Sequence, residues 1–292
     1  MDIGLLLIAT TQTGDLATIA QRVETLGFES LWIPEHPVIP QGFTTPFPFA
    51  PTLPEHYGRW IDPFIALTVA ATATTRLKLA TGICLLPERD PLLTAKVVAS
   101  LDYYSNGRVL LGVGAGWLKE ETEVMGTPFR QRWQRLRETV EAMRVLWTQV
   151  ESSYAGKLVQ FPAVRCEPKP VQPAGPPILL GAHGPKAFAR VAQTYDGWCP
   201  LSDDPHTYKQ AADEIRQLTR EAGRNPNRLD MTALVDPKGG TLSVDELNAY
   251  REAGATRLVL FSQHMAAEMA GGHTAMWIER IAPIVERAKR LS

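Results

Sequence analysis

The 292-residue sequence contains few cysteines and almost no net charge. Its three cysteines, Cys84, Cys166 and Cys199, are odd in number and widely spaced. That arrangement fits neither a disulfide framework nor a metal-binding knuckle, and it favours a reducing cytoplasm. The net charge is −1, and lysine and arginine are dispersed, so the composition predicts neither a nucleic-acid surface nor a membrane-binding basic patch. Small molecules are the expected partners.

Long hydrophobic runs are also missing. The apolar run over residues 3–9 is too short to span a membrane, and it lacks the basic flank that is typical of a signal peptide. We interpret it as a first β-strand.

Residues 90–121 hold the pattern around which the rest of the chain is organised. Four apolar residues recur at helical spacing and predict the buried face of a helix: Leu93, Val97, Leu101 and Tyr104. Asn106 and Gly107 end that helix. The run over residues 109–113 has no alternating polar residues, which predicts a strand buried on both faces of a parallel sheet. It leads into the glycine-rich segment 112–117, where backbone can approach a ligand closely.

Variants of this strand-helix unit occur eight times along the chain. Eight alternating units in a chain of this length predict one closed parallel (β/α)8 barrel over residues 1–292. An open doubly wound sheet is the alternative, and the even spacing makes it less favoured. Two insertions interrupt the rhythm. They are a proline- and aromatic-rich loop over residues 34–60, and a hairpin followed by a proline-rich excursion over residues 151–176.

The active face of such a barrel lies where the strands end, so residues just after the strands are the candidates for chemistry. This rule selects the following residues: Glu35 and His36, Gly82 and Ile83, Gly114, Gly116 and Trp117, and Gly181, Ala182, His183 and Gly184.

His36 can donate or accept a proton near neutral pH. The alternative is a loop histidine bonded to local backbone. The position of His36 at a strand end and its carboxylate neighbour, Glu35, favour a functional role. Adjacent side chains on an extended segment point in opposite directions, however, which argues against direct orientation of His36 by Glu35.

The segment 181–184 permits two interpretations. Flanking glycines before a helix start are typical of a phosphate-binding turn, but they also occur at an ordinary strand-helix corner. The glycines of 112–116 have neither Rossmann nor P-loop spacing, and Trp117 is interpreted first as a packing residue. We interpret the charged residues that follow as a solvated face rather than an acid/base set: Lys119, Glu120, Glu121 and Glu123. No Ser-His-Asp order and no metal-ligand spacing is present, so no metal site is expected.

Taken together, several segments resemble the bacterial luciferase-like superfamily, and within it the branch of oxidoreductases that use the deazaflavin coenzyme F420. The resemblance covers nearly the whole chain. The segments that carry it are 27–36 (GFESLWIPEH), 80–83 (ATGI), 89–100 (RDPLLTAKVVAS), 105–108 (SNGR), 112–117 (GVGAGW), 181–185 (GAHGP) and 196–198 (DGW).

This resemblance implies a (β/α)8 barrel with the cofactor ring over the strand ends and the phosphate tail at residues 181–184. It implies a bulge with a non-prolyl cis peptide at Gly82-Ile83, supporting one face of the ring. It places His36 near the reactive carbon, where it assists proton movement while hydride passes between cofactor and substrate. It also suggests a homodimer. The implied cofactor contacts are Glu35, His36, Gly82, Ile83, Gly114, Gly116, Gly181, Ala182, His183 and Gly184.

One residue departs from a branch of this family. In the sugar-phosphate dehydrogenases a carboxylate follows the glycine-rich exit, and Trp117 stands in that place. We therefore expect a flatter, more apolar substrate, packed by Trp117 and by the aromatic loop from Phe43 to Trp60. Flavin monooxygenases share most of the motifs, so an FMN-dependent monooxygenase is the alternative. The missing carboxylate at Trp117 also leaves a cofactor-binding protein without turnover as a second alternative.

Overall fold

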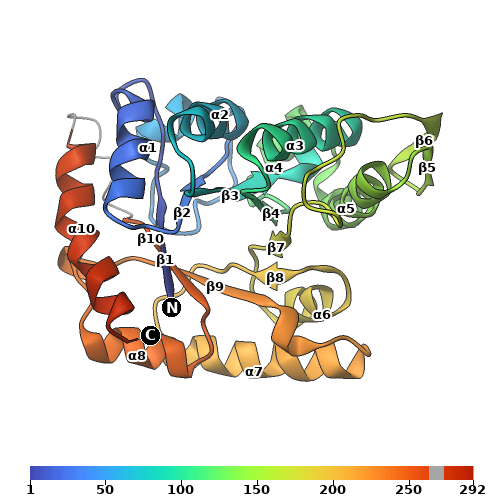
Figure 1. Ribbon diagram of the computed structural model, residues 1–292. Helices are drawn as coiled ribbons and strands as arrows, with labels where there is room; N and C mark the ends of the chain where they lie inside the picture. The colour runs from blue at the N-terminus through green and yellow to red at the C-terminus, as the bar shows by residue number, and fades with distance from the viewer. Residues whose placement is uncertain (263–272, 292) are drawn as a thin grey trace.

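A computed structural model describes residues 1–262 and 273–291 and shows a closed barrel of eight parallel strands, as predicted. Around the barrel the strands follow the order β1-β10-β9-β8-β7-β4-β3-β2 (Figure 1). Their bounds are β1 (Asp2–Leu6), β2 (Ser30–Ile33), β3 (Lys78–Leu85), β4 (Val109–Gly114), β7 (Ile178–Leu180), β8 (Gly197–Trp198), β9 (Asp230–Val235) and β10 (Arg257–Leu260).

Helices surround the barrel, and several begin at side chains that cap their first turn. Asp15, Asp62, Asp90 and Asp204 each accept hydrogen bonds from first-turn amides, and Ser243 forms a capping box with Glu246. No helix among the described residues is both long and apolar enough to cross a membrane. The helices are α1 (Leu16–Thr25), α2 (Pro63–Ala73), α3 (Pro91–Ser105), α4 (Lys119–Val124), α5 (Arg132–Thr148), α6 (Pro185–Thr194), α7 (Pro205–Glu221), α8 (Val244–Glu252) and α10 (Thr274–Lys289).

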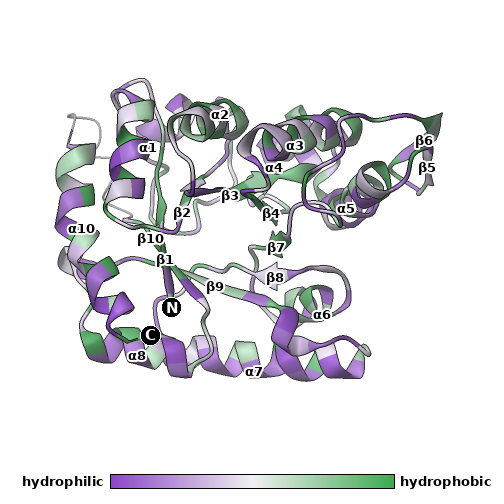
Figure 2. Ribbon diagram, viewed as in Figure 1, coloured by the Kyte–Doolittle hydropathy of each residue, from purple (hydrophilic) through white to green (hydrophobic). Residues whose placement is uncertain are grey.

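The barrel interior is filled by side chains from alternate positions of the strands. Figure 2 shows hydrophobic residues along the strands and a mixture of polar and apolar residues on outer helices such as α7. Ile83 packs against this interior cluster from the segment where β3 ends. The interior is therefore a packed core beneath the strand ends, and not a pore. The cluster consists of Leu6, Trp32, Ala80, Leu110, Leu179, Cys199, Leu234, Val259 and Phe261.

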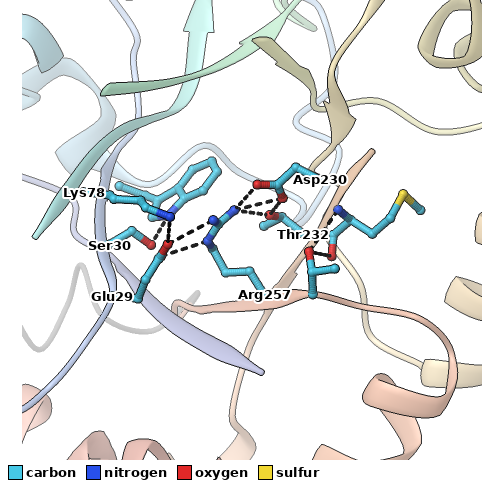
Figure 3. A network of polar contacts seen from close by, with 9 residues as sticks. Glu29, Ser30, Lys78, Asp230, Thr232 and Arg257 are labelled. Carbon is cyan, nitrogen blue, oxygen red and sulfur yellow. Dashed lines mark hydrogen bonds and ion pairs between the residues drawn. The ribbon is translucent and has the colours of Figure 1, made fainter. Parts of the chain in front are cut away.

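The amino ends of the strands are held by a network of paired charges (Figure 3). Arg257 Nε lies 2.9 Å from Glu29 Oε2, and Arg257 Nη1 lies 2.7 Å from Asp230 Oδ2. Lys78 Nζ contacts Glu29 Oε1 at 2.6 Å, and Thr232 Oγ1 accepts a further bond from Arg257. The strands β2, β3, β9 and β10 are thus tied together at the end opposite the candidate site.

The two insertions lie outside the barrel strands. β5 (Ser152–Ala155) and β6 (Gln160–Val164) form an antiparallel hairpin that lies beyond α5 in Figure 1. The loop over residues 34–60 ends in a short 3-10 helix, η1 (Glu55–Arg59), and Thr10 pairs with Trp60 in an isolated bridge. The loop is thereby joined to the segment that follows β1.

The predicted apolar face of α3 is wrong for three of its four residues. Leu93 is 68% exposed and Tyr104 is 82% exposed, and Val97 is exposed as well; only Leu101 is buried. The buried face instead carries small residues such as Ala95 and Ala99. Small side chains let a helix approach the barrel and its neighbours closely, so on this helix size rather than hydrophobicity marks the buried face.

Candidate active site

Three neighbouring strand ends bring the main candidate residues together. His36 follows β2 by three positions, the Gly82-Ile83 pair lies within the distal half of β3, and Trp117 follows β4 by three positions. Because β2 pairs with β3 and β3 with β4, these segments meet at one edge of the barrel mouth.

The imidazole of His36 is paired with a buried carboxylate. Nδ1 of His36 lies 2.6 Å from Oε2 of Glu121, and the two side chains are 7% and 1% exposed. A carboxylate at Nδ1 accepts a hydrogen bond from that nitrogen, so a proton exchanged with a ligand would pass through the other nitrogen, Nε2. Glu121 orients the ring as a buried carboxylate orients a general acid or base.

Aromatic rings enclose the other sides of His36. Their centroids lie 5.1 Å (Trp60), 5.2 Å (Tyr57) and 5.9 Å (Trp117) from the imidazole centroid. The indole N–H of Trp117 donates to His36 Nε2 over 3.3 Å. Burial raises the pKa of Tyr57 to about 12, so its hydroxyl stays protonated at neutral pH. The side chains that surround the imidazole of His36 on these sides are therefore mostly aromatic.

The loop over residues 34–60 supplies much of this wall and is fastened to α4. Glu120 accepts hydrogen bonds from the backbone amides of Thr44 and Thr45 and from both hydroxyls, at 2.6–3.2 Å. The hydrogen bond from the Thr45 hydroxyl, with the others, lowers the pKa of Glu120 to about 2. Phe43 precedes these threonines and is half-buried. The ring centroid of Phe47, also in this loop, lies 5.5 Å from that of Trp117.

The interpretation of the charged cluster after Trp117 as a solvated face is wrong for Glu121, which is buried, whereas Lys119 and Glu123 are exposed. Glu120 is partly exposed and holds the loop. A carboxylate thus does stand beside His36, four residues beyond Trp117, in the first turn of α4. The short spacing between the β4 exit and Glu121 was the only indication in the sequence.

Glu35 turns away from His36, as alternation along an extended segment suggests. Its Oε2 accepts the amide of Leu85 at 2.7 Å, and its Oε1 accepts Nε of Arg89 at 2.6 Å. Arg89 also contacts Asp62 at the start of α2. Both oxygens of Glu35 therefore join β2 to the end of β3, and the pair with His36 is made by Glu121.

The bulge implied at Gly82-Ile83 is present, and the peptide bond between these residues is cis, as expected from the resemblance. The pairing register of β3 with β4 shifts between Thr81 and Cys84. The side chain of Ile83 then lies against two of the candidate glycines. A Cβ on Gly114 would lie 2.0 Å from Ile83 Cδ1, and a Cβ on Gly181 would lie 2.8 Å from Ile83 Cγ2. Glycine at both positions therefore makes room for Ile83.

The exit of β7, the strand that pairs with β4, adjoins this edge of the mouth. Nε2 of His183 lies 2.7 Å from the carbonyl of Leu201, and the indole of Trp198 donates to the carbonyl of Ala182 at 2.8 Å. Gly184 has a φ of 91°, no heavy atom lies within 4 Å of where its Cβ would stand, and α6 begins there without a side-chain cap. An uncapped helix start beside open space fits a phosphate group.

The thiols and metal-binding residue types do not form a second site in the described parts of the chain. Cys84, Cys166 and Cys199 are unpaired, and burial raises the pKa of the Cys84 and Cys199 thiols. Neither buried thiol is therefore a nucleophile at neutral pH. Residues 1–262 and 273–291 contain no group of three or more His, Cys, Asp or Glu side chains placed to hold a metal ion.

Known proteins share this fold and much of this sequence. The family model for the luciferase-like monooxygenases matches residues 4–237. An uncharacterized protein of Mycobacterium tuberculosis is 35% identical over 286 residues, which cover 97% of this chain and 98% of that protein. The 5,10-methylenetetrahydromethanopterin reductase of Methanolobus tindarius is 26% identical over 263 residues, 89% of this chain and 71% of that enzyme. The structure of an F420-dependent secondary alcohol dehydrogenase with an F420-acetone adduct superposes with a TM-score of 0.78 at 18% identity, covering 98% of each chain.

Proposed function

The chain belongs to the luciferase-like monooxygenase family, and from this premise we propose that it is an oxidoreductase dependent on coenzyme F420. It transfers a hydride between the deazaflavin and a small, apolar organic substrate. The observation that carries the proposal is the buried His36–Glu121 pair beside the Gly82-Ile83 bulge. The matching protein of Methanolobus tindarius supports a hydride-transfer activity, because its name describes a reductase.

The residues of the mouth fit a ring with a phosphate tail. Ile83, raised by the bulge and given room by Gly114 and Gly181, would support one face of the ring. The turn 181–184 and the start of α6 would hold the phosphate, with Ala182 and His183 lining the turn. When bound, the deazaflavin supplies or accepts the hydride and reacts poorly with oxygen because a carbon replaces a ring nitrogen.

His36 moves the proton that accompanies the hydride. Glu121 holds Nδ1, so His36 would exchange a proton through Nε2 with the heteroatom of the substrate. Trp117, Trp60 and Phe43, joined by Phe47 and Tyr57, exclude water from this position. The same rings favour an apolar substrate and disfavour a sugar phosphate, whose charge would be desolvated without a partner.

Titration of the purified protein with coenzyme F420 and, separately, with FMN tests the cofactor. We expect tight binding of the deazaflavin, measured by quenching of its fluorescence, and weak binding of FMN. Tight binding of FMN alone rejects the proposal.

An FMN-dependent monooxygenase is the alternative, favoured by the description of the matching family. Reduced flavin and oxygen would then yield an oxygenated product with the protein present. A cofactor-binding protein without turnover is less favoured than the sequence suggested, because Glu121 supplies a carboxylate at His36. Reoxidation of the bound reduced cofactor on addition of a substrate would exclude it.

The proposal includes a homodimer that acts in the cytoplasm. Large apolar side chains are exposed on the adjacent helices α2 and α3, among them Ile65 (64%), Leu93 (68%) and Tyr104 (82%). Exposed apolar residues gathered on one face mark an interaction surface. Light scattering of the wild type and of Leu93→Glu tests it: a dimer is expected for the first and a monomer for the second. The unpaired cysteines support a reducing compartment.

A further inference from the structure

Glu88 is a buried carboxyl group that the proposed mechanism does not use. It ends a single turn of 3-10 helix, η2 (Leu86–Glu88), directly after β3, and the residue is 4% exposed. It lies beside the glycine-rich exit of β4, because a Cβ on Gly116 would stand 3.1 Å from Glu88 Oε1. Its place is therefore in the wall behind the His36–Glu121 pair.

The hydrogen bonds around Glu88 fit a neutral carboxylic acid. Oε1 of Glu88 and the carbonyl of Leu118 both lie 3.0 Å from the hydroxyl oxygen of Thr122. Thr122 has one hydroxyl hydrogen, and the Leu118 carbonyl can only accept. Both contacts are satisfied when the protonated carboxyl group of Glu88 donates a hydrogen bond through Oε1 to the Thr122 hydroxyl oxygen, and the Thr122 hydroxyl donates to the Leu118 carbonyl. Oε2 of Glu88 has no hydrogen-bond partner among the described residues, which would be costly for a carboxylate.

The charges that face Glu88 also favour its protonated form. Burial, followed by the negative charge of Glu121, raises the pKa of Glu88 to about 8, and Glu35 adds to this effect. Arg89 is the neighbouring cation, but Glu35 and Asp62 bind it. Arg135, from α5, is directed to the carbonyls of Pro87 and Leu158. Among the described contacts, neither Arg89 nor Arg135 therefore forms a hydrogen bond or an ion pair with Glu88.

We propose that Glu88 is a positioning residue that stores a proton behind the His36–Glu121 pair and, on losing it, strengthens the hold of His36 on its own proton. The proton leaves a Glu88 oxygen for solvent, and a second carboxylate then stands behind the imidazole. Nearby opposite charge favours an imidazolium by about one pH unit or more. Glu88 and His36 therefore titrate as a coupled pair. The inference rests on the proposed role of His36 in proton movement.

Glu88→Gln tests the inference, because the amide keeps the shape and the donor of the neutral acid but cannot ionise. Nitrogen NMR of the histidine rings, recorded on the protein without cofactor, reports the protonation of His36. We expect the titration of His36 in Glu88→Gln to be a single step with a midpoint below that of the wild type, because the amide never adds the second negative charge. Glu123→Gln, an exposed neighbour on α4, should leave the midpoint unchanged. Equal midpoints in Glu88→Gln and the wild type overturn the inference.

A second measurement needs no variant, so it remains decisive if Glu88→Gln does not fold. Carbon NMR of wild-type protein labelled at the glutamate carboxyls should show one carboxyl that titrates near pH 8. Titration of all glutamates below about pH 6 overturns the inference. Failure of the proposed function can be told apart from failure of this inference. Suppose that the His36 midpoint differs between Glu88→Gln and the wild type, but that the rate of hydride transfer in the cofactor-loaded enzyme does not change with pH over the same range. His36 then does not carry the proton, while its coupling to Glu88 is upheld.

Discussion

The two ends of the barrel hold buried charges in opposite ways. At the amino ends of the strands, Arg257 is 4% exposed and contacts two carboxylates and a hydroxyl, so its charge is fully matched. At the carboxyl ends, Glu121 is held by the His36 imidazole and the backbone amide of Val38, and Glu88 leaves an oxygen without a partner among the described residues. A matched network stabilises the fold and resists protonation, whereas an under-matched one can gain and lose protons near neutral pH. The difference assigns stability to one end and chemistry to the other.

The largest expected effect is on catalysis. His36→Ala removes the group proposed to move the proton, so we expect hydride transfer to fall about 10²–10⁴-fold, with a much smaller loss of cofactor affinity. Stopped-flow oxidation of the reduced cofactor and a binding titration give the two quantities. His206→Ala, on α7, is the matched control and should change neither. Equal losses in rate and affinity would mean that His36 only binds.

At the amino ends of the strands, the expected effect is on the free energy of unfolding. Arg257→Met leaves Asp230 and Glu29, which are both partly buried, without their main partner, so we expect unfolding in urea to show a loss of about 3–5 kcal/mol. Cofactor affinity of the folded molecules should not change. Arg22→Met is the control, because the Arg22–Glu279 pair is half exposed and should contribute little. A loss of affinity as large as the loss of stability would show that the two ends are not separate.

The sequence predicted the strands and helices of the barrel better than the side-chain contacts between them. Strand β4 spans Val109–Gly114 and so covers the predicted run over residues 109–113, because an apolar run without alternating polar residues is a local pattern. The face of α3 was wrong because its packing depends on the size of neighbours. Glu121 was missed because its burial depends on the loop over residues 34–60 and on His36, which is 85 positions away. Periodicity contains no information about such long-range contacts.

Acid should destabilise the matched end through Glu29. Burial opposes ionisation there, but the hydrogen bond and charge of Arg257 prevail and hold the pKa of Glu29 at about 2, below its ordinary 4.5. A depressed pKa contributes stability that is present above pH 4.5 and is lost as pH falls toward 2, here about 3 kcal/mol. Urea unfolding at a series of pH values should show this slope in the wild type and a flatter one in Glu29→Gln. Parallel slopes would contradict the assignment.

The smallest expected effect comes from the indole of Trp117. Its N–H donates to Nε2 of His36 over 3.3 Å, and Trp117→Phe keeps a ring but removes that donor. A hydrogen bond of this kind contributes about 0.5–1.5 kcal/mol, so hydride transfer should change less than about tenfold. Trp60→Phe is the matched control, since the Trp60 indole donates to His56 at 3.1 Å although its ring lies closer to His36 than that of Trp117, with centroid distances of 5.1 and 5.9 Å. Steady-state rates of both variants separate the donor from the ring. If Trp60→Phe changes the rate as much as Trp117→Phe, then aromatic packing, and not the N–H of Trp117, is what acts on His36.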